Sequence, residues 1–247
     1  MSASHEGNGT QMTSRSTRVA YERQLADLEE RALEALDFVV TALERTTEAI
    51  EHRDIELAEM VVADDDIIDG RYLEVHQRLL TMLATQSPVA GDLRVIAALL
   101  HLMKNVERMG DQCVNIAKIL PLSGHDAPSD ERIVANLVKM GEQVRTLTRQ
   151  AKRAFAERDI DLAHELVTAD DVVDTLNRQT FRLAIEVGDD QDIREWATTM
   201  ILVARALERI GDNAVDIGEQ VAFVVTGLFR EFQDASDPAA RISRLDG

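Results

Sequence analysis

Apolar residues recur every three or four positions along almost the whole chain, as they do in helices that bury one face. Proline, which interrupts a helix, is absent from residues 17–87 and 129–237, and both stretches are rich in Ala, Leu, Glu and Arg. No segment alternates apolar and polar residues for long enough to suggest a half-buried strand. The sequence therefore predicts an all-α fold.

Charged turns and prolines divide this pattern into six long helices. We expect them at residues 17–51, 55–86, 91–119, 129–157, 160–187 and 191–226. Residues 1–16 and 229–247 lack the same periodic pattern, so we expect an N-terminal and a C-terminal tail without fixed structure.

The chain also repeats itself. Arg53–Asp69 matches Arg158–Asp174 at nine of seventeen positions, and Glu107–Ile116 resembles Glu208–Ile217. Two copies of one three-helix unit explain all six helices. The predicted organisation is two tandem, sequence-repeated three-helix bundles. Their bounds are residues 17–120 for repeat one, 121–128 for the linker and 129–228 for repeat two.

Each repeat carries two steps in which acidic residues stand four positions apart. Such a step turns only about 40° around a helix, so both acids of a step share a face. Apolar side chains share that face in all four cases, which predicts that the acids point toward the core. The eight residues are Asp65, Asp69, Glu107, Asp111, Asp170, Asp174, Glu208 and Asp212.

Ionised carboxylates in apolar surroundings need partners, because an unpaired buried charge is strongly destabilising. A hard cation held by carboxylate oxygens of two facing helices would neutralise them compactly. The alternative is an arginine–acid network at a bundle rim or a dimer interface. The arginines nearest in sequence are Arg94, Arg108, Arg205 and Arg209.

Composition excludes several classes of function. The formal net charge of −18, from 45 Asp+Glu against 27 Lys+Arg, repels nucleic acid and anionic lipid. The longest unbroken apolar run, Val95–Leu100, is far too short to cross a membrane, and the first residues have no apolar core of a signal peptide. The single Cys113 can form no internal disulfide. We therefore expect a cytoplasmic protein.

Recognisable catalytic motifs are missing from the sequence. None of the six histidines stands three residues after a glutamate, so the Glu-x-x-His signature of ferritin-like di-iron bundles is absent. There is no phosphate-cradling glycine loop. Gly110 and Gly211, each inside an acid step, would let an ion or a neighbouring helix approach closely; ordinary tight helix packing explains them equally well.

The segments Glu107–Ala117 and Glu208–Ile217 resemble the duplicated signature of the PhoU family, the phosphate-specific transport system accessory proteins. Ser87–Arg94 resembles the family's turn into its third helix, whereas repeat two has Asp192–Arg194 instead, so the two sites need not be equivalent. The resemblance covers about residues 17–228. It implies a pair of three-helix bundles, often dimeric, with no reaction of its own.

The resemblance also implies a function and partners. Family members restrain phosphate uptake and the phosphate-starvation response, as negative regulators of the Pho regulon. They engage the ATPase subunit of the phosphate ABC transporter and a sensor histidine kinase. From the charge and apolar pattern described above, we expect no nucleic-acid partner and no direct insertion into the membrane.

Family members can hold multinuclear metal clusters on acid-x-x-x-acid motifs. The resemblance thus implies that the eight acids named above are metal ligands, with Asn115 and Asp216 as candidates for an outer shell. Iron is the metal expected first, and zinc, manganese or magnesium are alternatives. The second interpretation is a carboxylate-bridged metalloenzyme, an oxidase or a hydrolase, built in a helical bundle.

Overall fold

The computed structural model describes the backbone of residues 7–123, 128–229 and 231–232, and it is helical apart from short connections. No strand occurs within these ranges. The all-α, six-helix prediction is therefore confirmed. The elements are α1 (Gly7–His52), α2 (Ile55–Thr85), α3 (Ala90–Ile119), the short 3₁₀ helix η1 (Leu120–Ser123), α4 (Glu131–Glu157), α5 (Ile160–Glu186) and α6 (Gln191–Thr226).

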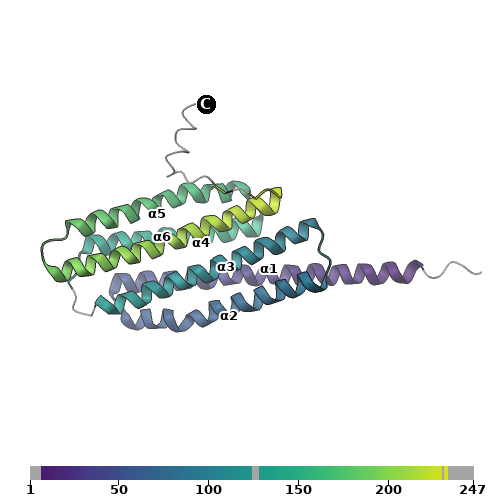
Figure 1. The fold of residues 1–247 in the computed structure, drawn as a ribbon, viewed down its shortest axis with the longest axis horizontal. Helices are drawn as coiled ribbons and strands as arrows, with labels where there is room; N and C mark the ends of the chain where they lie inside the picture. Colours follow the sequence, from purple (N-terminus) through teal and green to yellow (C-terminus); the bar gives the residue numbers. More distant parts are fainter. Residues whose placement is uncertain (1–6, 124–127, 230, 233–247) are drawn as a thin grey trace, which may run out of the picture.

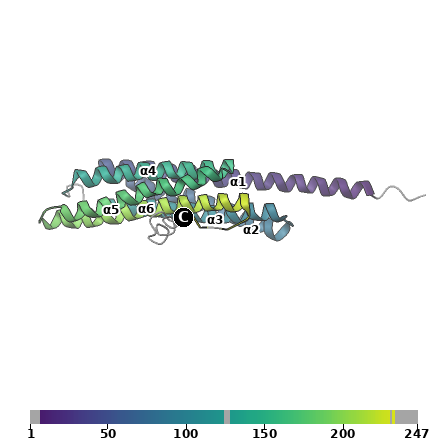
Figure 2. The same cartoon turned by 90° about the horizontal axis from the view of Figure 1, so that it is seen from above.

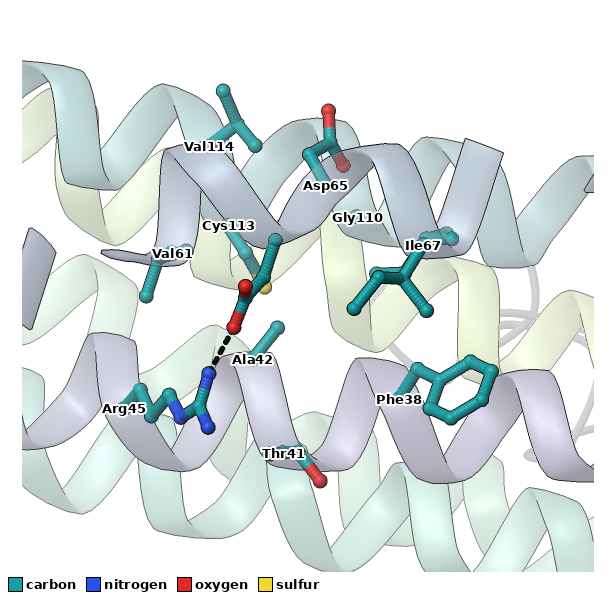
Figure 3. A pocket seen from close by; sticks show the side chains of 12 residues that line it. Phe38, Thr41, Ala42, Arg45, Val61, Asp65, Ile67, Gly110, Cys113 and Val114 are labelled. Carbon is teal, nitrogen blue, oxygen red and sulfur yellow. Dashed lines mark hydrogen bonds and ion pairs between the residues drawn. The ribbon is translucent and has the colours of Figure 1, made fainter. Parts of the chain in front are cut away.

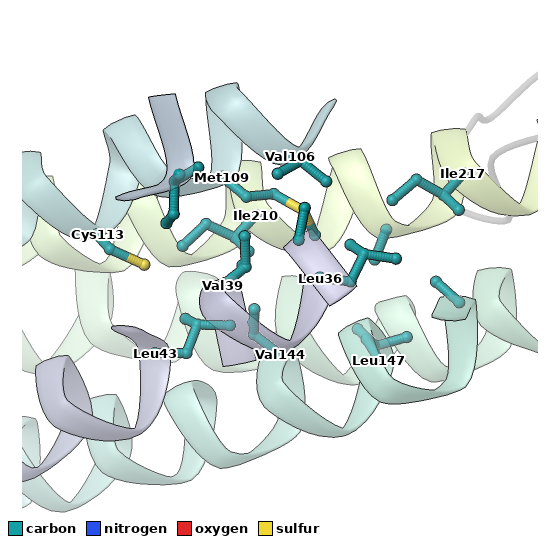
Figure 4. Close-up of a cluster of buried hydrophobic side chains, with 14 of the residues drawn as sticks. Leu36, Val39, Leu43, Val106, Met109, Cys113, Val144, Leu147, Ile210 and Ile217 are labelled. Atoms are coloured by element: carbon teal, nitrogen blue, oxygen red, sulfur yellow. The ribbon is translucent and has the colours of Figure 1, made fainter. Parts of the chain in front are cut away.

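All six helices run along one long axis, with α1–α3 in one half and α4–α6 in the other (Figure 1). The two repeats lie side by side along their length, and the first part of α1 extends beyond the other helices (Figure 2). Buried side chains from all six helices form one continuous cluster. Leu36 of α1, Met109 of α3, Leu147 of α4 and Ile217 of α6 meet in it (Figure 4). The two three-helix units thus share a core.

The turn that joins the first two helices of each repeat is the same in both copies. Arg53 and Arg158 adopt the left-handed conformation, with φ of 53° and 56°. Asp54 and Asp159 follow them, and each caps the next helix by accepting a backbone N–H at 2.9 Å. This local chemistry explains why the sequence repeat is clearest here.

Helices α1 and α4 join the two halves at close range. A Cβ atom on Gly141 would overlap the side chain of Thr47, so glycine permits this approach of the two helices. Ion pairs flank the contact along its length. They are Glu29–Arg158 at 2.7 Å, Asp37–Lys152 at 2.6 Å and Glu44–Arg145 at 3.0 Å. Surface pairs of this kind contribute little stability singly, but a row of them favours one register.

Two predicted boundaries differ from the structure. Helix α1 begins at Gly7, inside the segment 1–16 that was expected to be a tail. Phe229 and Phe232, in the expected C-terminal tail, pack on the bundle, since their rings lie 6.2 Å from His101 and 4.6 Å from His164. Aromatic contacts therefore hold the chain beyond α6. The remaining parts of both tails and half of the linker lie outside the described residues, namely residues 1–6, 124–127, 230 and 233–247.

Among the described residues, no helix is both long enough and apolar enough to cross a membrane.

Candidate carboxylate sites

In repeat one, the carboxylate of Asp65 on α2 lies over the backbone of α3. A Cβ atom on Gly110 would stand 3.2 Å from Asp65 Oδ1 and 3.1 Å from Ile68 Cδ1, closer than ordinary packing. In repeat two, a Cβ atom on Gly211 would overlap the carboxylate of Asp170. Both glycines thus open space for an aspartate oxygen between the second and third helices.

In repeat one, acids of α2 and α3 raise one another's pKa across the groove between these two helices. Burial raises the pKa of Asp65 to about 6, and the charges of Asp69 and Asp111 add to the rise. Burial also raises the pKa of Asp111, and Glu107 and Asp69 raise it further. The four acids of repeat one therefore belong to one electrostatic cluster.

In repeat two, Asp174 of α5 raises the pKa of two acids of α6 in the same way, across the groove between these helices. The pKa of Asp212 is raised to about 6. Partial burial of its carboxyl group is the main cause, and the charges of Glu208 and Asp174 add to it. Burial raises the pKa of Glu208 as well, and Asp174 adds to this while Arg205 opposes it. Each groove thus holds several carboxylates that resist simultaneous ionisation.

Basic side chains on the same helices pair with three of the eight acids. Lys104 Nζ lies 2.6 Å from Glu107 Oε2 and Arg178 lies 3.4 Å from Asp174. Arg205 forms an ion pair with Glu208, in line with one of the arginines expected from the sequence. The arginine–acid network thus exists in part.

Two of the other expected arginines lie elsewhere. Arg94 packs over Gly227 at the end of α6, and Arg108 acts on Asp216 of the other repeat. Arg209, by contrast, lowers the pKa of Glu208 through its charge.

The prediction that all eight acids point inward, between the second and third helices of each repeat, is wrong for three of them. Of the eight, only Glu208 is buried, with 9% of its surface exposed. Asp65, Glu107, Asp170 and Asp174 are half-buried, and Asp69, Asp111 and Asp212 are exposed. The reason is that α3 and α6 are apolar on two faces. One faces the shared core, and the other faces the second helix of its own repeat, where the acids line the open edge.

The donor set suits a hard cation, because it consists of carboxylate oxygens whose mutual repulsion a positive ion would relieve. Within the described ranges, however, no three acidic, histidine or cysteine side chains are already arranged to hold one ion. Ligation would require carboxylates to rotate toward one another. Both outer-shell candidates, Asn115 and Asp216, are exposed. Partial burial of the Asp216 carboxyl group raises its pKa, and the charges of Arg108 and His101 oppose the rise.

The groove of repeat two contains further acids that sequence analysis missed. A pocket of about 250 Å³ is lined by six acidic residues and is bordered by Phe232. The backbone N–H of Phe232 donates to Glu219 Oε1 at 2.6 Å, and its ring lies against Gly218. The acids not expected from the sequence are Asp171 and Glu219, and the outer-shell candidate Asp216 also lines the pocket.

Comparisons with known proteins match both repeats. A family model described as the PhoU domain matches residues 32–120 and again residues 137–221. The phosphate-specific transport system accessory protein PhoU homolog of Clostridium acetobutylicum is 30% identical over 220 residues, which cover 88% of this chain and 100% of that protein. PhoU homolog 1 of Mycobacterium leprae is 31% identical over 230 residues, covering 91% of this chain and 100% of that protein.

A solved structure agrees with these sequence matches. PhoU from Pseudomonas aeruginosa superposes with a TM-score of 0.78 at 27% identity, over 84% of this chain and 100% of that chain. Sequence and fold therefore match through the first and the second repeat alike.

Proposed function

The chain belongs to the PhoU family, and on this basis we propose that it is an accessory protein of phosphate-specific transport that regulates uptake and carries out no reaction of its own. The observation that carries the proposal is the match of the family model to both halves of the chain. Relatives that align over their whole length are named as accessory proteins of this transport system, which supports the same role here.

Within this role, the protein acts as a helical adaptor in the cytoplasm. Its proposed partners are the ATPase subunit of the phosphate ABC transporter and a sensor histidine kinase, with a second copy of the chain completing a homodimer. The support is the resemblance of its duplicated signature to the family, together with the long helices that present extended surfaces to partners.

Metal binding is the second component of the proposal. The ligands would come from the acid steps Asp65/Asp69 and Glu107/Asp111 in repeat one, and from the equivalent acids of repeat two. The raised pKa values of Asp65 and Asp212 support it, because a bound cation would stabilise the ionised form that the apo protein disfavours. A hard cation would supply charge neutralisation there, and iron is the first candidate.

Gene deletion tests the regulatory role. We expect loss of the protein to derepress phosphate-uptake genes in phosphate-replete cells, and a plasmid-borne copy to restore repression. Unchanged phosphate-responsive transcription, in a strain without a second homologue, would contradict the proposal.

Assays of the purified protein separate the adaptor from the alternative metalloenzyme. Protein loaded with iron or manganese should neither form peroxide nor hydrolyse phosphoesters above the rate of the free metal. A rate that depends on Glu107 and Asp111 would favour the enzyme instead.

A further inference from the structure

A second kind of pocket opens in repeat one, between α1 and α2, with α3 as its floor (Figure 3). Its volume is about 220 Å³. Its lining is mainly apolar, in contrast to the acidic pocket of repeat two. The apolar side chains include Phe38, Ala42, Val61, Ile68 and Val114.

Repeat two has different side chains at the equivalent positions of α4. The shared turn at Arg53 and Arg158 aligns α1 with α4, so that Ala42 corresponds to Leu147, which is fully buried. Phe38 and Arg45 correspond to two glutamines, Gln143 and Gln150.

Both glutamines tie α4 to α5. Gln143 Nε2 donates to the carbonyl oxygen of Ala169, and Gln150 Nε2 donates to that of Leu162, each at 3.1 Å. Repeat one has a smaller side chain at the position of Leu147, and an aromatic and a charged side chain in place of the two amides. The lining of the pocket in repeat one therefore differs from the matching positions of repeat two.

The residues that line the pocket carry more negative than positive charge. Arg45 and Asp64 form an ion pair there, drawn as the dashed line in Figure 3. Asp65, which also lines the pocket, adds a further carboxylate. Because the one cation is already paired, a ligand with a positive end is favoured over one with a negative end.

We propose that this pocket binds a small molecule with an apolar, ring-sized body and one positive charge, of the class of the arylalkylamines. The space suits this size, since a dry apolar cavity of about 150 Å³ binds benzene and this one is larger. The apolar walls would take up the ring, and the two carboxylates among the lining residues, Asp64 and Asp65, would attract the ammonium group. The inference does not rest on the proposed regulatory role, but it shares Asp65 with the proposed metal site, so it concerns the metal-free protein.

Titration calorimetry with three indole compounds tests the proposal on the metal-free, full-length protein. Tryptamine provides the ring and a cation, indole the ring alone, and indole-3-propionate the ring and an anion. We expect saturable one-site binding with tryptamine tightest and indole-3-propionate weakest. The absence of saturable binding by tryptamine would overturn the proposal, and so would equal or tighter binding of the anion.

Two variants locate the site. Ala42→Leu introduces the side chain that repeat two has at Leu147, and should weaken tryptamine binding by about tenfold or more, because the added atoms occupy the pocket. Ile67→Ala at the rim removes a side chain that is 53% exposed, so folding should survive even where Ala42→Leu disturbs it. We expect it to weaken binding by about fivefold.

Val172→Ala is the matched control, because Val172 occupies the position of Ile67 in repeat two and is 47% exposed. It should leave the dissociation constant unchanged. Equal effects of Ile67→Ala and Val172→Ala, or no effect of Ile67→Ala, would place the binding elsewhere and overturn the proposal.

Discussion

The carboxyl groups of Asp65 and Asp212 combine two conditions that raise an acid's pKa, partial removal from water and further acids nearby. Both values stand at about 6, so these groups change charge in a pH range where ordinary aspartates are fully ionised. The two repeats carry the same property at equivalent grooves. The ionised carboxylates in each groove therefore repel one another, and protonation or a bound cation would remove this repulsion.

The first prediction concerns the pH dependence of the metal-free protein. Asp65 and Asp212 bind protons more tightly in the folded than in the unfolded chain, so the free energy of unfolding should fall as pH rises through about 6. Replacing both by asparagine should flatten this slope. Urea unfolding at about pH 5 and about pH 8, for wild type and the double variant, measures it. Identical slopes would contradict the assignment of the raised pKa values.

The second prediction joins this property to metal binding. If a cation neutralises the grooves, chelator should lower the melting temperature more at about pH 8 than at about pH 5.5, where protonation already relieves the repulsion. Elemental analysis of protein purified without chelator identifies the ion. The control is the variant with Glu107→Gln and Asp111→Asn, in which chelator should have a smaller effect at the higher pH. Equal chelator effects at both pH values would favour the arginine–acid network.

At the scale of the helices, glycine decides how closely neighbours approach. Gly141 brings α4 against Thr47 of α1, whereas Gly70 of α2 has no atom within 4 Å of where a Cβ would lie. The same residue type therefore has opposite consequences in two helices. At Gly141 it permits contact, and at Gly70 it only lowers helix propensity.

The third prediction compares these two positions. Gly141→Ala should lower the free energy of unfolding by about 1–3 kcal/mol, because the new methyl group overlaps Thr47. Gly70→Ala should raise it by up to about 1 kcal/mol, since alanine favours the helix and meets nothing. Urea unfolding of both variants tests the pair. A stabilising Gly141→Ala would show that α1 and α4 are not in close contact.

Helix positions could be predicted from the sequence because their signals are local. Asp54 and Asp159 cap helices and Pro88 stops one, and the observed ends of α2 and α5 lie within one residue of those expected. The start of α1 was missed, because Ser, Thr and Gly in its first turns obscure the periodic pattern.

The environment of the acids could not be predicted in the same way. Helical periodicity shows that Asp111 shares a face with apolar residues, but it does not show which neighbouring helix covers that face. Since α3 packs on both α2 and α6, an apolar face toward α2 can still have an open edge. The packing of Phe232 on the bundle depends on contacts with distant residues, so the local sequence gave no direct indication of it.

At the scale of the whole molecule, the two repeats are not independent domains. Their cores merge, and the row of ion pairs between α1 and α4 crosses the boundary. Side chains of α3 and α6 that face this boundary, such as Met109 and Ile210, are fully buried. Separation of the repeats would expose these apolar faces to water.

The fourth prediction follows from this shared core. The single tryptophan, Trp196, is buried in α6 and reports on repeat two, whereas far-ultraviolet circular dichroism reports on all helices. We expect both signals to change at the same urea concentration, in one cooperative transition. The metal-free protein is the sample to use, because a bound ion would complicate the two-state treatment. Two separated midpoints would show that the repeats unfold independently.

The shared core also bears on how the chain is made. During synthesis, α1–α3 emerge before the helices that cover their apolar sides exist, so the nascent first repeat leaves Met109 and its neighbours in contact with water. The second repeat of another copy presents a matching surface at that moment.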